Sequence, residues 1–241
     1  MTTKSNWLPF MTNDALCQIL GELKIAADTA KTKAENSFSR NVIDPFTALF
    51  QMQLLSIQSA DWPIIEKRRQ IEKSLQNHIG NFHQKLLGNL TDWNDMTVGS
   101  VVDLVSEERR IIAEVKNKHN TLKKSDQSGL YDKLSELVRK KGQRYYGFTA
   151  YYVEIIPKHP VRYNEVFTPS DNTTGSKKPE DPLIRKIDGA SFYALATGHE
   201  DALRQVYEAI PKALARIGLP PMNREDKAML SNYFSDAFGS I

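Results

Sequence analysis

The hydrophobic period of this chain changes after Trp93, and that change limits the folds open to it. Before Trp93, apolar residues recur every three or four positions, which is typical of amphipathic helices. After it come two β-branched runs, VGSVVDLVS at 98–106 and IIAEVKNK at 111–118, with EERR at 107–110 between them. Two such runs around a short polar break predict a β-hairpin. We therefore expect an α/β core that follows a helical N-terminal part.

Start signals predict three helices in the first ninety residues. Thr12 or Asn13 can cap a helix that runs to about Ala34, and Asp44-Pro45 and Asp61-Trp62-Pro63 open the next two. Apolar residues at helical spacing are expected to point into a core. They are Leu16, Ile19, Leu20, Leu23 and Ala27, then Phe46, Leu49, Phe50, Leu54 and Ile57, then Ile64, Ile65, Ile71, Leu75 and Ile79.

The rest of the chain alternates between the two periods. The expected elements are a helix capped by Ser125 or Asp126 and ending near Lys141, strands at 145–156 and 190–198, and helices at 200–216 and 224–238. Residues 157–182 form a polar excursion that is too long for a plain connector. This order fits one α/β domain over 1–241, with a helical part at 1–90, a core at 91–217 and a C-terminal helix at 218–241.

Composition narrows the setting of the protein. The single cysteine, Cys17, cannot form an internal disulfide, which favours a reducing compartment. The N-terminus lacks the apolar region of a signal peptide, and no run approaches the ~20 apolar residues of a membrane span. A soluble, cytoplasmic protein is therefore expected.

Two acids and a lysine interrupt the predicted hairpin strands. Asp103 lies in VVDLV, and Glu114 and Lys116 lie in IIAEVKNK. Side chains alternate along a strand, so Glu114 and Lys116 share a face about 6.6 Å apart, and Asp103 can meet Glu114 across the hairpin. Two carboxylates can hold a hard divalent cation, and the lysine can orient or help deprotonate a water that attacks phosphorus. The alternative is an ordinary cross-strand ion pair.

The charge distribution gives a second indication. The whole chain has a net charge of only +3, but residues 109–144 hold eleven Lys and Arg against four Asp and Glu, a net of +7. The remainder carries 21 basic and 25 acidic residues, a net of −4. A basic region around the hairpin would attract a phosphate backbone, although a solvated helix face would have the same composition.

At these residues the sequence resembles the PD-(D/E)XK nucleases, as seen in type II restriction endonucleases. The motif is Asp103…Glu114-Val115-Lys116, with Val102 where the pattern has proline, a departure that many restriction enzymes share. Further blocks resemble the restriction-enzyme subgroup associated with the site GGNCC. They are NHIGNFHQKLLG (77–88), EVKNKHNT (114–121) and DGASFYALATGHEDALRQVYEAIP (188–211).

The resemblance implies a restriction-endonuclease-like core, a mixed central sheet flanked by helices, which depends on Mg²⁺. It implies that Asp103 and Glu114 bind the metal, that the backbone carbonyl of Val115 adds a ligand, and that Lys116 positions the water. Family members often recruit one more acid from an earlier helix; Glu72 is the candidate, and nothing in the sequence separates it from Glu66. The resemblance also implies a homodimer that cuts double-stranded DNA at a short palindrome, and a cognate DNA methyltransferase as genetic partner.

The residues after Lys116 are candidates for contact with DNA. Asn can pair with adenine, and Lys with guanine or phosphate. The candidates are Asn117, Lys118, His119, Asn120, Lys123, Lys124, Lys140 and Lys141. Two alternatives stay open at this point: a repair or junction-cleaving nuclease of the same fold, and a non-catalytic DNA-binding protein.

Overall fold

The computed structural model describes residues 5–38, 42–96 and 100–239. The chain forms two compact units, one of residues 1–19 and 83–241 and the other of residues 20–82. Helices α1 (Asn13–Ser37) and α3 (Trp62–Gly88) contribute residues to both. Where the structure is described, no helix is long and apolar enough to cross a membrane.

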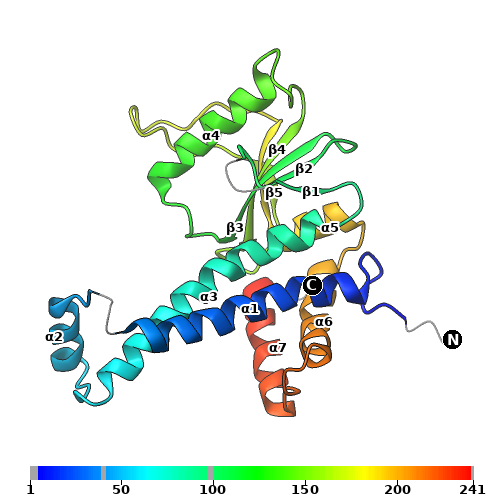
Figure 1. Cartoon of the computed structure of the whole chain (residues 1–241). Coiled ribbons are helices and arrows are strands. Elements are labelled where there is room, and N and C mark those ends of the chain that lie inside the picture. Colours follow the sequence, from blue (N-terminus) through cyan, green and yellow to red (C-terminus); the bar gives the residue numbers. More distant parts are fainter. Residues whose placement is uncertain (1–4, 39–41, 97–99, 240–241) are drawn as a thin grey trace. The chain divides into compact units, whose positions relative to one another are not determined.

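A six-stranded mixed sheet forms the centre of the first unit. Its strand order is β1-β2-β3-β4-β6-β5, and Figure 1 shows the sheet beside α4 (Lys124–Arg139). Strands β3, β4 and β6 are parallel, and the pairs β1–β2, β2–β3 and β5–β6 are antiparallel. The strands are β1 (Asn94–Asp95), β2 (Leu104–Ser106), β3 (Ile111–Lys118), β4 (Thr149–Ile156), β5 (Asn164–Val166) and β6 (Ile184–Asp188). This confirms the expected mixed sheet and the β2–β3 hairpin, with Leu104 opposite Ala113.

Helices cover both faces of the sheet. Leu134 and Val138 of α4 (Lys124–Arg139) share a buried apolar cluster with Ile112 of β3 and Tyr152 of β4. Alternate residues of β4 point the other way, and the Tyr151 ring lies 5.9 Å from the Phe192 ring of α5 (Gly189–Thr197). The sheet is therefore flanked by helices, and the even-numbered residues of β3, β4 and β6 face α4.

The expected strand at 190–198 is wrong, because these residues form α5. The carboxylate of Asp188 accepts a hydrogen bond from the Ser191 amide and so caps the helix, and Gly198 ends it with a φ of 77°. A side chain at Gly189 would come within 2.4 Å of the Ile155 carbonyl oxygen, so only glycine fits where the helix packs onto β4. The strand beside β4 is β6 instead.

The remaining helices of the first unit lie near their expected positions. They are α6 (Ala202–Arg216) and α7 (Arg224–Phe238). The N-cap of α4 is Lys123, two residues before Ser125 and three before Asp126, and no side chain accepts a hydrogen bond from the first turn. The strand expected at 98–106 is shorter, since β2 begins only at Leu104, and residues 98 and 99 lie outside the described part.

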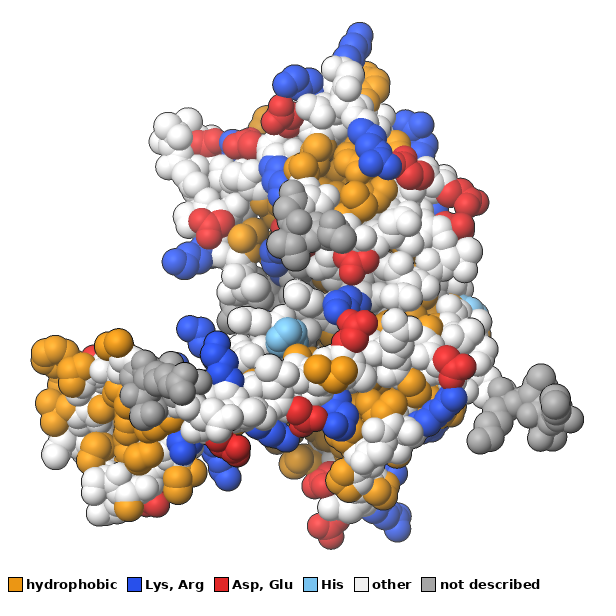
Figure 2. All heavy atoms as spheres, viewed as in Figure 1, with side chains coloured by type: hydrophobic (Ala, Val, Ile, Leu, Met, Phe, Trp, Pro, Cys, Tyr) orange, Lys and Arg blue, Asp and Glu red, His pale blue; other side chains and the backbone are white. Residues whose placement is uncertain are grey.

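The second unit contains α2 (Pro45–Leu54) and parts of α1 and α3. Asp44 caps α2 and Pro45 is its first residue, as expected. The expected inward face of α2 is wrong, because none of its residues is buried. Helical spacing indicates which residues share a face, but not whether anything covers it. Figure 2 shows hydrophobic side chains exposed here; they include Phe46, Leu49, Phe50, Leu54, Ile64 and Ile65.

Candidate active site

Strand β3 places Glu114 and Lys116 on the face of the sheet that α4 covers. Ile112, two residues before Glu114, is buried against α4, so the alternation of the strand turns the next two even-numbered side chains the same way. The Lys116 ammonium donates to Oε1 of Glu114 at 2.8 Å. Lys133 of α4 approaches the other oxygen of Glu114, with 3.9 Å between Nζ and Oε2. The predicted shared face is confirmed.

Asp103 joins this pair from the other side of the hairpin. It stands one residue before β2, and its amide donates to the Ala113 carbonyl at 3.0 Å. Its Oδ2 accepts from the Val115 amide at 2.7 Å and lies 3.7 Å from the Lys116 ammonium. Both carboxylates therefore converge on one lysine. All three side chains are partly buried, between 14% and 25% exposed.

The charges of the trio formed by Asp103, Glu114 and Lys116 are unbalanced. Burial, reinforced by the nearby Glu114 carboxylate, holds the pKa of Asp103 above its usual value, against the opposing pull of Lys116. Burial alone would lower the pKa of Lys116, but its hydrogen bond to Glu114 and the charges of both acids outweigh burial and raise that pKa. Without a bound cation, Lys116 is therefore an ammonium that donates a hydrogen bond to Glu114.

The donor set at the hairpin suits a hard divalent cation. The carboxylates of Asp103 and Glu114 and the carbonyl of Val115 offer oxygen atoms, which Mg²⁺ prefers as ligands. Within the described residues, no group of three or more His, Cys, Asp and Glu side chains lies close enough together to hold a metal. Asp103 and Glu114 thus fit as a two-carboxylate centre, and the Lys116 ammonium now neutralises the charge that a cation would neutralise.

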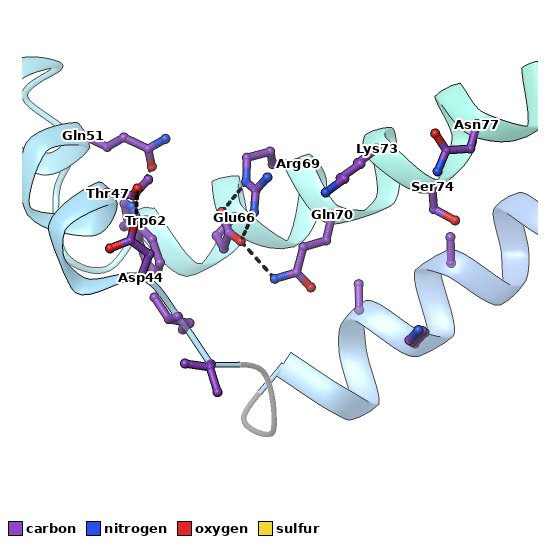
Figure 3. A pocket seen from close by; sticks show the side chains of 15 residues that line it. Asp44, Thr47, Gln51, Trp62, Glu66, Arg69, Gln70, Lys73, Ser74 and Asn77 are labelled. Carbon is purple, nitrogen blue, oxygen red and sulfur yellow. Dashed lines mark hydrogen bonds and ion pairs between the residues drawn. The ribbon is translucent and has the colours of Figure 1, made fainter. Parts of the chain in front are cut away.

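Glu66 and Glu72, the two candidates for an additional acid, belong to the second unit. Glu66 lines a cavity of about 860 Å³, and its carboxylate accepts from Arg69 at 2.6 Å and from Gln70 at 3.0 Å (Figure 3). The hydrogen bond from Arg69 holds the pKa of Glu66 below its usual value, against the effect of burial. Glu72 is exposed and, in the described part of the chain, has no ion pair. The oxygens of Glu66 are engaged, whereas those of Glu72 meet no partner among the residues that the structure describes.

The candidate DNA contacts that follow Lys116 lie at the end of β3. Lys118 is the last residue of the strand and is exposed, and Asn117 beside it is half-buried. The His119 amide donates to the Ile156 carbonyl at 3.0 Å, which fixes the turn after the strand, while Asn120 is exposed. Nδ1 of His119 is buried without a hydrogen-bond partner.

The two lysine pairs lie at opposite ends of α4. Lys123 is the N-cap and Lys124 the first residue, whereas Lys140 is the C-cap and Lys141 follows it. Sixteen helical residues separate the pairs by about 24 Å. Lys140 pairs with Glu136 at 2.9 Å and is favoured by the C-terminal end of the helix dipole. Lys123 and Lys124 oppose the dipole at the N-terminus, and within the described chain neither forms an ion pair.

Sequence reasoning missed a charged group beside the trio. Glu154 of β4 is 2% exposed; its Oε2 accepts a hydrogen bond from Tyr163 at 2.7 Å and forms an ion pair with the Lys186 ammonium at 3.1 Å. Tyr163 belongs to the polar excursion 157–182, so this part of the excursion is anchored to the sheet. The signal was present: Glu154 interrupts the apolar run YYVEII as Asp103 interrupts VVDLV.

Comparison with known proteins tests the resemblance. The sequence profile of the Eco47II restriction endonuclease family matches residues 8–218. The type II restriction enzyme Eco47II of Escherichia coli is 44% identical over 237 residues, which cover 96% of this chain and 99% of that protein. The type II restriction enzyme Sau96I of Staphylococcus aureus is 32% identical over 218 residues, 89% of this chain and 81% of that protein. No solved structure matches the chain.

The family match and the two relatives span the hairpin, α4 and most of the sheet. They confirm the expected kind of protein, a type II restriction endonuclease that acts on DNA as a site-specific endodeoxyribonuclease. The mixed sheet flanked by helices agrees with that fold. The chain therefore belongs to the Eco47II restriction endonuclease family.

Proposed function

We propose that this protein is a Mg²⁺-dependent enzyme that hydrolyses both strands of double-stranded DNA at a short palindrome, with GGNCC as the expected site. Hydrolysis leaves 5′-phosphates. The observation that carries the proposal is the convergence of Asp103 and Glu114 on Lys116, with 3.7 Å and 2.8 Å between the ammonium and the two carboxylates. An ordinary ion pair joins one carboxylate to one ammonium. Here two carboxylates meet Lys116 and the Lys133 ammonium comes no nearer to Glu114 than 3.9 Å, so a cation would complete the neutralisation of the two acids.

Each residue of the site has a role in this proposal. Asp103, Glu114 and the carbonyl of Val115 hold Mg²⁺, which when bound polarises the scissile phosphate and neutralises the charge that develops on it. Lys116 donates a hydrogen bond to the attacking water and so orients it toward phosphorus. Glu72 is the additional acid, and its unengaged carboxylate supports it over Glu66.

DNA contacts are proposed along the end of β3 and both ends of α4. Exposed lysines bind phosphates, while amide and imidazole side chains contact base edges. The contact residues are Asn117, Lys118, His119, Asn120, Lys123, Lys124, Lys140 and Lys141.

A palindromic site has the two-fold symmetry of a homodimer, and we propose that two copies of the chain cut one site, one strand each. Within each copy, residues 1–241 act as a single nuclease domain. Host DNA would need protection in the cytoplasm where the enzyme acts, so a DNA methyltransferase gene is expected beside this one. Sedimentation with and without DNA measures the dimer, and the neighbouring genes test the partner.

Digestion of unmethylated plasmid DNA tests the function. With Mg²⁺ we expect discrete fragments whose sequenced ends share one palindrome and carry 5′-phosphates, and with EDTA no cutting. Cleavage of branched DNA in preference to plasmid would instead indicate a junction nuclease. DNA binding without cutting in any divalent metal would indicate a non-catalytic protein and would overturn the proposal.

A further inference from the structure

One carboxylate oxygen of Glu154, Oε1, has no hydrogen-bond partner among the described residues. The side chain is 2% exposed; Oε2 is engaged by Tyr163 and Lys186, while Oε1 is buried and has no hydrogen-bond partner. An unsatisfied buried acceptor costs about 1–3 kcal/mol, more when it is charged. Such a group takes a further donor; the Tyr152 hydroxyl, which is also buried without a partner and interacts with this carboxylate, is one candidate, and an ammonium that moves in another state of the protein is a second.

The sheet places this oxygen next to the candidate active site. Strands β3 and β4 are parallel, with Lys116 paired to Glu154 and Glu114 paired to Tyr152. Paired residues on neighbouring strands point to the same face, and such strands lie about 4.8 Å apart. Tyr152 is buried against α4, so Glu154 and Lys116 both stand on the α4 side of the sheet. Glu154 therefore flanks Lys116 on the side away from Asp103.

A divalent cation and the Lys116 ammonium compete for the same carboxylates. The ammonium now donates to Glu114 at 2.8 Å and lies 3.7 Å from Asp103. A cation bound by these acids would repel it at contact distance, so the lysine has to turn aside. Its flexible four-carbon stem permits this without movement of the strand.

We propose that Glu154 is a positioning residue that receives the Lys116 ammonium on Oε1 when a divalent cation binds Asp103 and Glu114. This inference rests on the proposed metal site. Lys116 then stays inside the site, beside the reacting water, instead of swinging into solvent. Glu154 is held ready, because Lys186 and Tyr163 fix Oε2 and the Lys186 ammonium lies over the rings of Tyr152 and Tyr163 at 5.9 and 5.5 Å.

The charge balance of the metal-free and the metal-bound site supports this movement of Lys116 to Glu154. Without metal, Asp103 and Glu114 share the Lys116 ammonium, Lys133 approaches Glu114 only at 3.9 Å, and Glu154 pairs with Lys186. With a divalent cation, the two acids balance the metal and Glu154 balances Lys116. The ammonium groups of Lys133 and Lys186 are then left without full compensation, and the site gains two positive charges for the arriving DNA backbone.

Calorimetric titration of the full chain with Ca²⁺, without DNA, tests the inference. Wild type, Glu154→Gln, Lys116→Met and the double variant form a double-mutant cycle. We expect Glu154→Gln to weaken Ca²⁺ binding about tenfold where Lys116 is present, because the ammonium has no second acceptor and competes with the metal. In the Lys116→Met background the same change is expected to alter binding less than about twofold. Lys116→Met alone should bind Ca²⁺ more tightly than wild type.

An equal loss in both backgrounds would mean that Glu154 only supports the fold, and no loss in either would mean that it takes no part; each overturns the inference. Melting temperatures identify a variant that does not fold, and Glu154→Asp, which keeps the charge, is then compared in the same two backgrounds. Asp103→Ala separates failure of the proposed metal site from failure of the proposed role of Glu154. If it binds Ca²⁺ as wild type does, the metal site itself is wrong, and the inference fails with it.

Discussion

Two clusters of acids and cations in this protein have similar hydrogen bonds but opposite electrostatics. In one, Asp103 and Glu114 share the ammonium of Lys116, with 2.8 Å for the shorter contact. In the other, Glu66 accepts from Arg69 at 2.6 Å and from Gln70. The pKa of Asp103 is raised by burial and by Glu114, whereas the pKa of Glu66 is lowered by Arg69. In the first cluster Lys133 approaches Glu114 only at 3.9 Å and the two carboxylates are incompletely neutralised, whereas the second cluster is satisfied.

This difference separates a candidate site from a structural ion pair. A cluster whose own groups satisfy its charges gains little from a further cation, and its members serve the fold. A partly buried cluster with surplus negative charge is destabilising until something positive arrives. Contact distances alone would rank the two clusters equally, so the balance of charge is what distinguishes them.

The largest expected effect is on cleavage. In the proposed mechanism Asp103→Ala removes a metal ligand and Lys116→Met removes the group that orients the water, and each should lower the rate of plasmid cleavage by more than about 10³-fold. Arg69→Met is the matched control in the satisfied cluster and should cut within about threefold of wild type. The measurement is the single-turnover rate in Mg²⁺. Full cleavage by both hairpin variants would refute the site.

The hairpin and its trio were predictable from the sequence because they depend on local signals. Alternation along IIAEVKNK gives the shared face of Glu114 and Lys116, and charges inside β-branched runs indicate Asp103. Glu154 carries the same signal, but its pairing with Lys116 depends on the parallel contact of β3 and β4, which no local pattern gives. Residues far apart in the chain had to be placed by the fold.

Helices α2 and α5 show the same limit. The aromatic run of α5 resembles a buried strand, and its caps, Asp188 and Gly198, outweighed that composition. The apolar spacing of α2 is helical as expected, yet its side chains are exposed. Periodicity gives the local conformation and the shared face, while burial depends on partners from elsewhere in the chain.

The two candidates for the additional acid, Glu72 and Glu66, also differ in whether their carboxylates are engaged. If Glu72 assists the metal, Glu72→Gln should raise the Mg²⁺ concentration for half-maximal cleavage about tenfold. Glu66→Gln, whose carboxylate is already engaged by Arg69, should leave that concentration nearly unchanged. Titration of the cleavage rate with Mg²⁺ measures both. The reverse order would show that Glu66 leaves Arg69 to reach the metal.

The two lysine pairs of α4 differ in the same way, in whether an acid already engages their charge, and this difference should affect DNA binding. Replacing Lys123 and Lys124 by alanine should lower DNA affinity by up to about tenfold at low salt and reduce the slope of log K against log salt by about 2. The Lys140 and Lys141 double variant should lose less, because Lys140 is paired with Glu136. Fluorescence anisotropy in Ca²⁺ at several salt concentrations measures both. Equal losses would mean that DNA contacts the whole length of α4.

The smallest expected effect is on stability, and its sign differs between the clusters. Asp103→Asn keeps an oxygen to accept from the Val115 amide but removes a charge that the fold disfavours, so the metal-free protein should gain about 1 kcal/mol. Glu66→Gln removes a charge that Arg69 favours and should lose about 1 kcal/mol. Each change corresponds to about 2–4 °C in melting temperature.

The pH dependence of unfolding stability gives an independent test of the sign of each stability change. The raised pKa of Asp103 means that the fold is disfavoured by this group at neutral pH and gains stability as the pH falls through that pKa. The gain from Asp103→Asn should therefore shrink toward pH 4. The lowered pKa of Glu66 stabilises the fold above the unfolded value of 4.5, and this contribution is lost as the pH falls through the folded pKa. Melting curves in EDTA at pH 7.5 and pH 4 separate the two. If both variants shift in the same direction at pH 7.5, the charge surplus does not distinguish the clusters, and the hairpin trio is as satisfied as the Glu66–Arg69 pair.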